Sequence, residues 1–310
     1  MDNLLSIVIL SYNRPHSVNL NISNLINQIN EMPINIYIFD DSDNNKVEEN
    51  IKSNFPESKT IFYIKNDPPF GHDHNYLQSL EFPDTEYVWL LGDSTALLEG
   101  ALEYAINILQ EYAPDLILMN AIGRDIKIPS TLYKSPKDFL LDLGWHSTLT
   151  GACIYSRRII NQININELLA YKNFPQIGAI FNNNILDPSF YWINKNLIFN
   201  QAEKKSYWAS QPFDVFLNDW IEVINSLPDH YPEDIKRKAI LNHSKKTCIF
   251  SYRSMLKFRS DGALNAEILL KYFSLLKVHS SVYWPLLFIL AITPKKLIKF
   301  FMSTGKNRSC

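Results

Sequence analysis

The sequence has few cysteines and no surplus of charge of either sign. Its three cysteines, Cys153, Cys248 and Cys310, lie far apart and form no CxxC pair. This pattern argues against a disulfide framework or a structural zinc site and is consistent with a reducing compartment. The formal net charge of −2 lacks the basic surplus that is typical of nucleic-acid-binding proteins, so no nucleic-acid partner is expected.

Long apolar runs are missing as well. No segment contains the roughly 18 uninterrupted apolar residues that a membrane-spanning helix needs. The opening residues, MDNLLSIVIL, carry no basic segment and no small-residue cleavage site, so they do not look like a signal peptide. We therefore expect a cytoplasmic protein.

The C-terminal end, residues 279–302, does have an apolar block that is followed by lysines. An apolar face with aromatic residues and flanking lysines is typical of a helix that lies on anionic lipid. We expect peripheral association with the inner face of the plasma membrane; the alternative is a helix docked on the protein's own core. A helical end of this kind is also a candidate interface for a homo-oligomer. The residues concerned are Tyr283, Trp284, Lys295, Lys296 and Lys299.

The first 125 residues alternate between short apolar runs rich in β-branched residues and segments with helical periodicity. The apolar runs are residues 6–12, 34–41, 60–66, 87–93 and 115–121. Continuous apolar runs separated by helical segments are typical of a parallel sheet covered by helices on both faces. The pattern predicts an α/β fold with a Rossmann-like, mostly parallel central sheet.

After Arg124 the pattern loosens. Residues 135–160 predict a helix, a polar loop, a strand and another helix, and the segment PSFYWINKNLIFNQ predicts two short strands around residues 194–196. Beyond Gln211 nearly everything reads as helix. We therefore expect an α/β domain over residues 1–210 and a helical region over residues 211–310.

Polar residues gather where the predicted strands end. In open α/β sheets, ligands bind beyond the carboxyl ends of the strands, so these residues predict one shared site. They are Asn13 and Arg14, residues 40–43 (DDSD), Asn66, Asp67 and Asp93.

Each of these residues has a functional and a structural interpretation. A carboxylate at Asp40 or Asp41 can accept a hydrogen bond from a base or a ribose hydroxyl, or can simply cap a turn. Asp93 can coordinate a divalent cation through oxygen. The aromatic ring of Tyr12 and the amide of Asn13 suit a flat heterocycle, or belong to turn and core.

Four segments resemble, in order and spacing, the inverting family 2 glycosyltransferases of the GT-A fold. LSIVILSYNRP matches the family's first strand and loop, IYIFDDSDNN its second strand, FGHDHNYLQSL its ARN segment, and YVWLLGDSTALLEGAL its acidic motif. The match covers residues 4–103 and weakens through about residue 200. The wording WLLGD looks like the branch with abequosyltransferase-like and other bacterial surface-polysaccharide enzymes.

The resemblance implies a nucleotide-diphosphosugar donor, with a UDP-sugar favoured, and a glycan or lipid-linked acceptor. It places the nucleotide beside Tyr12, Asn13 and Arg14, and the base or ribose on Asp41 or Asp40. Two further residues, His74 and Asn75, occupy the position of the family's Arg-Asn pair. There His74 replaces a fixed cation by a ring that titrates.

The acidic motif departs from the family's pattern. Relatives carry two or three aspartates that hold Mn²⁺ or Mg²⁺ against the diphosphate, whereas here Asp93 is followed by Ser94 and Thr95. Either Asp93 holds the cation with waters and phosphates, or an arginine, lysine or histidine stabilises the leaving diphosphate instead.

The catalytic base has no match either. The family's base is an acid further along the chain, where this sequence reads NFPQIGAIFNNN without a carboxylate. His146 is the first candidate, and a loop histidine satisfied by backbone is the alternative. Weaker candidates are Asp187, Asp214 and Asp219, and Trp145 could stack on a sugar ring.

The leading interpretation is an enzyme that moves a sugar to an acceptor hydroxyl in bacterial surface-polysaccharide synthesis. A nucleotidyltransferase would need a glycine-rich phosphate loop after the first strand, and SYNRPHSVN contains no glycine. The non-enzymatic alternative is a degenerate GT-A domain that serves as a binding or scaffold subunit, since the acidic motif is reduced and the base is missing.

Overall fold

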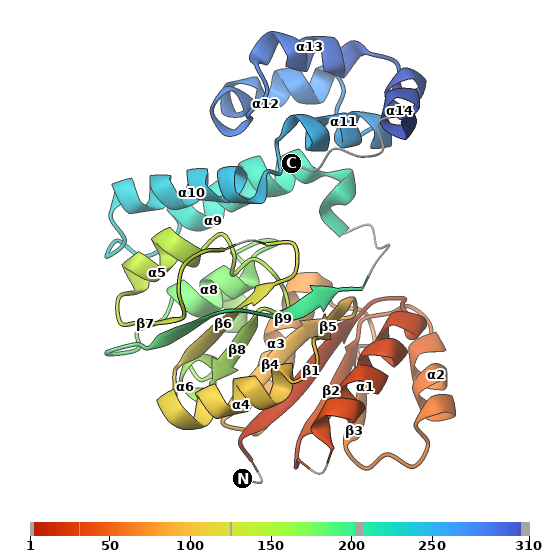
Figure 1. The fold of residues 1–310 in the computed structure, drawn as a ribbon, viewed down its shortest axis with the longest axis vertical. Coiled ribbons are helices and arrows are strands. Elements are labelled where there is room, and N and C mark those ends of the chain that lie inside the picture. Colours follow the sequence, from red (N-terminus) through yellow and green to blue (C-terminus); the bar gives the residue numbers. More distant parts are fainter. Residues whose placement is uncertain (1–2, 31, 125, 202–206, 305–310) are drawn as a thin grey trace. The chain divides into compact units, whose positions relative to one another are not determined.

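The computed structural model describes residues 3–30, 32–124, 126–201 and 207–304. These residues belong to two compact units, Met1–Lys204 and Lys205–Cys310, which are treated separately below (Figure 1).

The first unit is built on one sheet whose described strands follow the order β3-β2-β1-β4-β8-β6-β9-β5, with β7 paired to β9 (Figure 1). The strands are β1 (Leu5–Ser11), β2 (Asn35–Asp40), β3 (Ile61–Lys65), β4 (Tyr87–Gly92), β5 (Thr95–Leu97), β6 (Leu116–Ala121), β7 (Thr131–Tyr133), β8 (Cys153–Ser156) and β9 (Phe190–Asn200).

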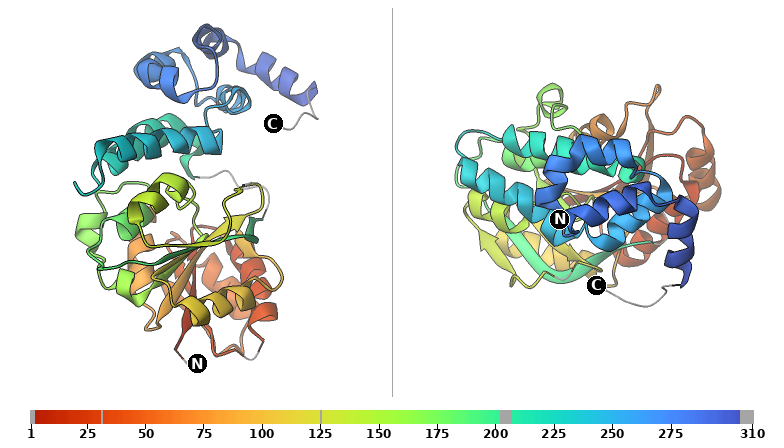
Figure 2. Two further views of the ribbon diagram at one scale, coloured as in Figure 1. Left: turned by 60° about the vertical axis from the view of Figure 1, so that its left-hand side comes forward. Right: turned by 90° about the horizontal axis from the view of Figure 1, so that it is seen from above.

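The N-terminal strands β1 to β4 pair with one another only in parallel. β1 pairs in parallel with β2 and β4, and β2 pairs in parallel with β3. Every residue of β1 is buried, so the strand is apolar without alternation, as expected where helices cover both faces. Figure 2 (left) shows helices on both sides of the sheet. The predicted α/β class, with its central sheet flanked by helices, is confirmed.

The helices of this unit form two groups. α1 (Pro15–Ile29) contacts α2 (Lys46–Asn54) and α4 (Ala101–Tyr112), whereas α3 (His72–Glu81) contacts α7 (Ile165–Leu168) and α8 (Pro175–Phe181). The remaining helices are α5 (Pro136–Leu143) and α6 (Arg157–Ile160).

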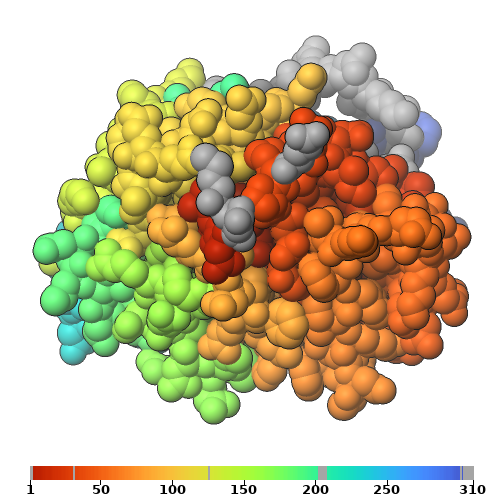
Figure 3. Space-filling model, turned by 90° about the horizontal axis from the view of Figure 1, so that it is seen from below, coloured from red at the N-terminus to blue at the C-terminus, as the bar shows by residue number. Residues whose placement is uncertain are grey.

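The chain reverses its direction of progress across the sheet between β1 and β4. From β1 it passes to β2 and β3 at one edge, and α3 then leads back to β4 on the other side of β1. Figure 3 shows the face at which β1 begins, with red-to-orange N-terminal residues on one side and yellow-to-green residues on the other. A reversal of strand order leaves a crevice at the carboxyl ends of the two central strands, which is where such sheets bind ligands.

The far half of the sheet differs from the sequence-based prediction in two places. Residues 190–200 form one strand, β9, instead of two short ones, because register shifts between Met119 and Ala121 of β6 absorb the extra residues. Residues 95–97, directly after the predicted acidic loop, form the short strand β5, which pairs with the end of β9.

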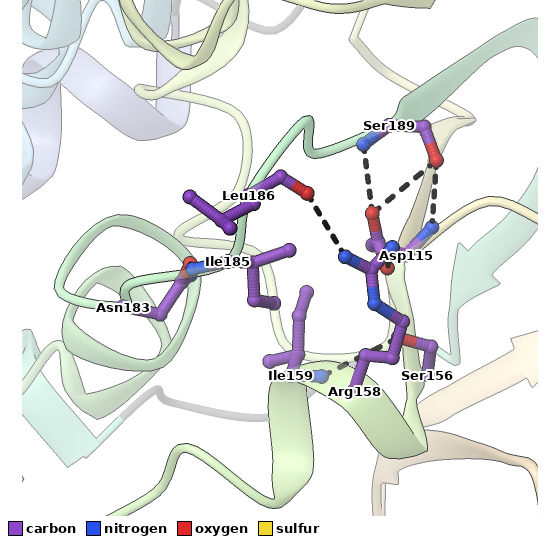
Figure 4. Close-up of polar contacts among 8 residues, drawn as sticks. All are labelled: Asp115, Ser156, Arg158, Ile159, Asn183, Ile185, Leu186 and Ser189. Atoms are coloured by element: carbon purple, nitrogen blue, oxygen red, sulfur yellow. Dashed lines mark hydrogen bonds and ion pairs between the residues drawn. The ribbon is translucent and has the colours of Figure 1, made fainter.

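A buried carboxylate ties this half together (Figure 4). Asp115, just before β6, accepts hydrogen bonds at Oδ2 from the backbone N–H of Ser189 (2.8 Å) and from its hydroxyl (3.3 Å). Its Oδ1 lies 2.9 Å from Nη1 of Arg158 in α6, and Arg158 also donates to the carbonyl of Leu186 (Figure 4). Asp115 therefore joins β6, β9 and α6, and its role is structural.

The second unit is helical over its described residues. Its elements are the 3₁₀ turn Tyr207–Ser210, the π-helical turn Asp214–Asp219, α9 (Trp220–Asn225), α10 (Glu233–Thr247), α11 (Tyr252–Asp261), α12 (Ala266–His279), α13 (Trp284–Ile292) and α14 (Lys295–Thr304). Aromatic packing forms its core, with the Phe213 ring stacked on the rings of Phe250 and Tyr272. Among the described residues, no helix has the length and apolar character needed to cross a membrane.

Candidate functional site

The site lies where β1, β2 and β4 end side by side. In the register of the sheet, Ser11 of β1 is level with Asp40 of β2, and Leu10 is level with Gly92 of β4. The loops that follow these strands therefore leave the same edge together. The structure thus brings together the strand-end residues that the sequence singled out.

Asp93 and Arg14 meet across the point where the strand order reverses. The Nη1 atom of Arg14 lies 3.6 Å from Oδ1 of Asp93. The Asp93 carboxylate also accepts hydrogen bonds from the backbone N–H of Tyr12 and from the N–H and hydroxyl of Ser94. Asp93 is 4% exposed, and this burial raises the pKa of its carboxyl to about 6, although Arg14 and these hydrogen bonds act to lower it.

The backbone of the Asp93 loop is held by a residue that sequence reasoning missed. Asn21 of α1 donates from Nδ2 to the carbonyls of Gly92 (3.2 Å) and Asp93 (2.8 Å), and its Oδ1 accepts from Nε2 of Gln201 (3.0 Å). Asn21 lies between Val18 and Leu25 on the buried face of α1. A polar residue on an apolar helical stripe was the available signal, because such a residue needs a buried partner.

Tyr12 and Asn13 are the first two residues of the loop after β1. The Tyr12 side chain is 57% exposed, which leaves its ring available at this edge. Asn13 has a left-handed backbone (φ 56°), donates its N–H to Oγ of Ser42 (2.7 Å), and accepts at Oδ1 from Nδ2 of Asn44 (2.6 Å). The loops after β1 and β2 are therefore joined directly.

Asp40 is part of the framework. Its Oδ1 accepts from the N–H (3.2 Å) and hydroxyl of Ser42, and its Oδ2 accepts from the hydroxyl of Tyr63 (2.8 Å). The side chain is fully buried, and the negative charge of Asp40 adds to burial in raising the pKa of Tyr63 far above its usual value.

Asp41 shapes the loop that leads into α3. Its Oδ1 accepts from Nδ2 of Asn66 (3.0 Å) and from the N–H of Phe70 (2.7 Å), and its Oδ2 accepts from the N–H of Gly71 (2.8 Å). The geometry shows a loop-forming aspartate at the edge of the site. A contact between either strand-end aspartate and a nucleotide stays a prediction.

Asn75 and His74 belong to α3 and behave differently. Asn75 is buried, and its Oδ1 accepts from Nδ2 of Asn66 (2.8 Å), so it supports the same loop. His74 is half-buried, its ring centroid lies 4.6 Å from that of Phe70, and its Nδ1 has no hydrogen-bond partner among the described residues. A role of His74 toward a phosphate or sugar stays a prediction.

His146 lies in the core, in surroundings that disfavour a role as base. Its Nε2 lies 2.9 Å from the carbonyl of Met119, and its Nδ1 lies 3.2 Å from Nη1 of Arg124. The ring is therefore neutral, donates from Nε2 and accepts at Nδ1. Burial, followed by the charge of Arg124, lowers the pKa of His146 to about 3. Because both nitrogens are engaged and the side chain is fully buried, we do not assign the base to His146.

The other candidates for the acceptor side also have structural surroundings. Trp145 is buried and donates from Nε1 to the carbonyl of Asp142 (2.9 Å), so its ring is part of the core. Asp187 is exposed in the loop before β9. Asp214 pairs with Lys271 (2.8 Å) inside the second unit, where Asp219 is buried. No general base is assigned from these residues.

Among the described residues, the donor set around Asp93 fits a divalent cation poorly. Within the described part of the chain, no group of three or more histidine, cysteine, aspartate or glutamate residues could hold a metal ion. Thr95 donates to the carbonyl of Thr150 (3.3 Å), and a Cβ on Gly151 would lie 2.5 Å from Cγ2 of Thr95, so Thr95 is packed in place. A cation on Oδ1 of Asp93 would also stand beside the guanidinium of Arg14.

Among the solved structures that resemble the chain in fold are TarS of S. aureus and a mannosyltransferase of Pyrobaculum calidifontis. TarS 1-349 of S. aureus in complex with UDP-GlcNAc has a TM-score of 0.59 and 14% identity, over 98% of this chain and 93% of that one. The mannosyltransferase PcManGT from Pyrobaculum calidifontis, in complex with GDP-Man and Mn²⁺, has a TM-score of 0.54 and 11% identity, over 99% and 89%. No curated protein matches the sequence.

The family is shown by the sequence itself. The model of glycosyl transferase family 2 matches residues 6–165, which is more than half of the chain and includes the strands that build the site. The chain therefore belongs to glycosyl transferase family 2 and is a glycosyltransferase.

Proposed function

We propose that this enzyme transfers a sugar from a nucleotide-diphosphosugar, with a UDP-sugar favoured, to a hydroxyl of a glycan or lipid-linked acceptor in bacterial surface-polysaccharide synthesis. The observation that carries the proposal is the meeting of the loops after β1 and β4 at the reversal of strand order, where Arg14 faces Asp93. Structures of similar fold with bound UDP-GlcNAc, UDP and GDP-Man support a nucleotide-sugar donor.

The residues at the edge suit the parts of such a donor. The exposed ring of Tyr12 offers a face on which a nucleobase stacks. The carboxylate of Asp41 accepts a hydrogen bond from the base or the ribose. The guanidinium of Arg14 has the planar, multi-donor geometry that matches a phosphate group.

The proposed reaction is a single displacement at the anomeric carbon. The acceptor oxygen forms a bond to this carbon from the side opposite the leaving group, which inverts the configuration. The bond from the carbon to the diphosphate oxygen breaks, and its electron pair stays on the nucleoside diphosphate. The acceptor hydroxyl loses its proton to a general base, and positive charge at the site stabilises the leaving diphosphate.

A lipid surface is the second part of the proposal. Apolar side chains of α13 and α14 are exposed, among them Trp284, Ile289 (59%) and Ile292 (70%), and Lys296 and Lys299 are exposed on α14. Lysines beside an exposed apolar face complement anionic headgroups. The proposed occupant of this face is therefore the anionic inner leaflet of the plasma membrane, with the enzyme on its cytoplasmic side.

Calorimetric binding of UDP-, GDP- and dTDP-sugars tests the donor class. We expect one nucleotide to bind selectively and Tyr12→Ala to weaken its binding about tenfold or more, since stacking on an aromatic ring contributes ~1–3 kcal/mol. Tyr252→Ala is the matched control, because Tyr252 lies in the second unit and is also 57% exposed. If no nucleotide binds, the proposed function is wrong.

A further inference from the structure

The negative charge that develops on a leaving diphosphate needs a positive group beside it. The described donor set around Asp93 fits a divalent metal poorly. What the structure places there is an arginine. We propose that Arg14 supplies the charge that stabilises the leaving diphosphate, in place of a divalent cation. This inference rests on the proposed function, since it concerns the diphosphate of the same donor.

Arg14 is positioned for this role by the fold. It occupies the N-cap of α1, in the loop that directly follows β1, and its side chain is 27% exposed. It is therefore in contact with solvent while one side faces Asp93.

The ion pair leaves Arg14 free to bind a second anion. At 3.6 Å, the separation between Nη1 of Arg14 and Oδ1 of Asp93 exceeds that of a hydrogen bond. The guanidinium thus keeps N–H donors for phosphate oxygens, which it can contact in pairs. Asp93, fixed by Tyr12 and Ser94, holds the guanidinium at the edge without saturating it.

The helix that begins at Arg14 adds to the positive potential. α1 starts with Pro15, has no acidic residue in its first turn, and its N-cap residue, Arg14, makes no side-chain capping hydrogen bond. The positive end of the helix dipole is therefore uncompensated by α1's own side chains, beside the guanidinium.

The same geometry opposes a metal. A cation coordinated by Asp93 would lie roughly 2 Å from its carboxylate oxygen. That position is next to the positively charged guanidinium of Arg14. The two cations would repel each other in a largely buried site, where charges are poorly screened. Ser94 and Thr95, where relatives carry further acids, offer no negative charge to offset this repulsion.

The chemical step balances without a metal. As the bond between the anomeric carbon and the diphosphate oxygen breaks, the electron pair goes to that oxygen. Arg14 donates hydrogen bonds to the diphosphate and keeps its own protons, and the acceptor's proton goes to the general base.

The test is calorimetric binding of UDP, GDP and dTDP to the full chain, once in EDTA and once with Mn²⁺. We expect the dissociation constant of the selected nucleotide in Mn²⁺ to be equal to or higher than in EDTA, because Mn²⁺ masks the phosphate charge that Arg14 recognises. Arg14→Gln should weaken binding in EDTA about ten- to hundredfold, and Arg14→Lys should weaken it less. Arg237→Gln, an exposed arginine of α10, is the control and should stay within twofold.

Three results would overturn the inference. Binding that is more than threefold tighter in Mn²⁺ than in EDTA would show that a metal takes part, and would leave the proposed donor class intact. Equal binding by wild type and Arg14→Gln would remove Arg14 from the diphosphate. Failure of all nucleotides to bind under either condition would overturn the proposed function together with the inference.

Discussion

At the scale of single residues, Asp93 combines two properties that rarely favour stability. It is buried, and the guanidinium of Arg14 lies 3.6 Å from its carboxylate, beyond hydrogen-bonding distance. Burial outweighs the ion pair and the hydrogen bonds, which is why the pKa of Asp93 is raised from 3.8 to about 6. The fold thus keeps a carboxylate where an amide would be easier to bury, as is common at functional sites.

A stability measurement checks this interpretation. Because the folded protein binds the Asp93 proton more tightly than the unfolded chain, stability from this group falls as pH rises from about 3.8 to about 6. At pH 7, Asp93→Asn should therefore raise the free energy of unfolding by about 1–3 kcal/mol, and below pH 3.8 the two proteins should differ little. Sugar transfer should drop at least tenfold, because Arg14 loses the carboxylate that positions it.

Urea denaturation of wild type and Asp93→Asn across pH 3.5 to 8 gives the comparison, with the exposed Asp229→Asn as the control. A variant that is less stable than wild type at pH 7, with no dependence on pH, would contradict the interpretation.

At the scale of elements, α1 organises the site more than the strand ends do alone. Its first residue follows Arg14, and its buried face carries Asn21, which binds the carbonyls of Gly92 and Asp93 at the end of β4. The helix therefore couples the loop after β1 to the loop after β4. A single side chain, that of Asn21, makes this connection.

Asn21→Ala removes the hydrogen bonds that connect α1 to the end of β4. We expect the free energy of unfolding to fall by about 1–3 kcal/mol, since two buried carbonyls and the amide of Gln201 lose their partner. Nucleotide binding should weaken severalfold, because the backbone that carries Asp93 is no longer held. Chemical denaturation and calorimetry measure the two effects.

Asn54→Ala is the matched control for Asn21→Ala, because Asn54 lies on the exposed side of α2 and its side chain donates to the carbonyl of Asn50 in the same helix. It should change stability by less than about 0.5 kcal/mol. If the two substitutions had equal effects on nucleotide binding, Asn21 would have no special role at the site.

At the scale of the whole molecule, the composition gives no hint of membrane affinity, because the net charge is −2 and no described helix can span a bilayer. The affinity we propose is local to α13 and α14. We expect the full chain to float with vesicles that contain phosphatidylglycerol, and to bind vesicles of phosphatidylcholine alone much more weakly.

Two variants separate the apolar and the electrostatic parts of this interaction. Ile289→Ser with Ile292→Ser should reduce vesicle binding at least tenfold, and Lys296→Glu with Lys299→Glu should remove the preference for anionic lipid. Leu186→Ser is the control, since Leu186 is 83% exposed in the first unit. No flotation, together with a dimer in sedimentation that Ile289→Ser disrupts, would mean that a second copy of the chain covers this face instead.

Much of this protein is determined by local sequence. Apolar runs and helical periodicity predicted the α/β class and the strands that carry the site, and the four motifs predicted the family that residues 6–165 match. These properties depend on residues that are a few positions apart in the chain, so they can be predicted from a single sequence. Contacts between residues that lie far apart in the chain could not be predicted from the sequence. Arg14 meets Asp93, and Asn21 meets Gly92, because the sheet reverses its order between β1 and β4.

His146 is a second example of what the sequence could not predict. From the sequence, His146 was a candidate base on the acceptor side. The structure places it in the core, between Arg124 and the carbonyl of Met119. The sequence by itself determined the N-terminal strands that carry the site and where they end. Tertiary structure decided which charges face each other there, because burial and the distance between groups, on which electrostatic energies depend, exist only once the chain is folded.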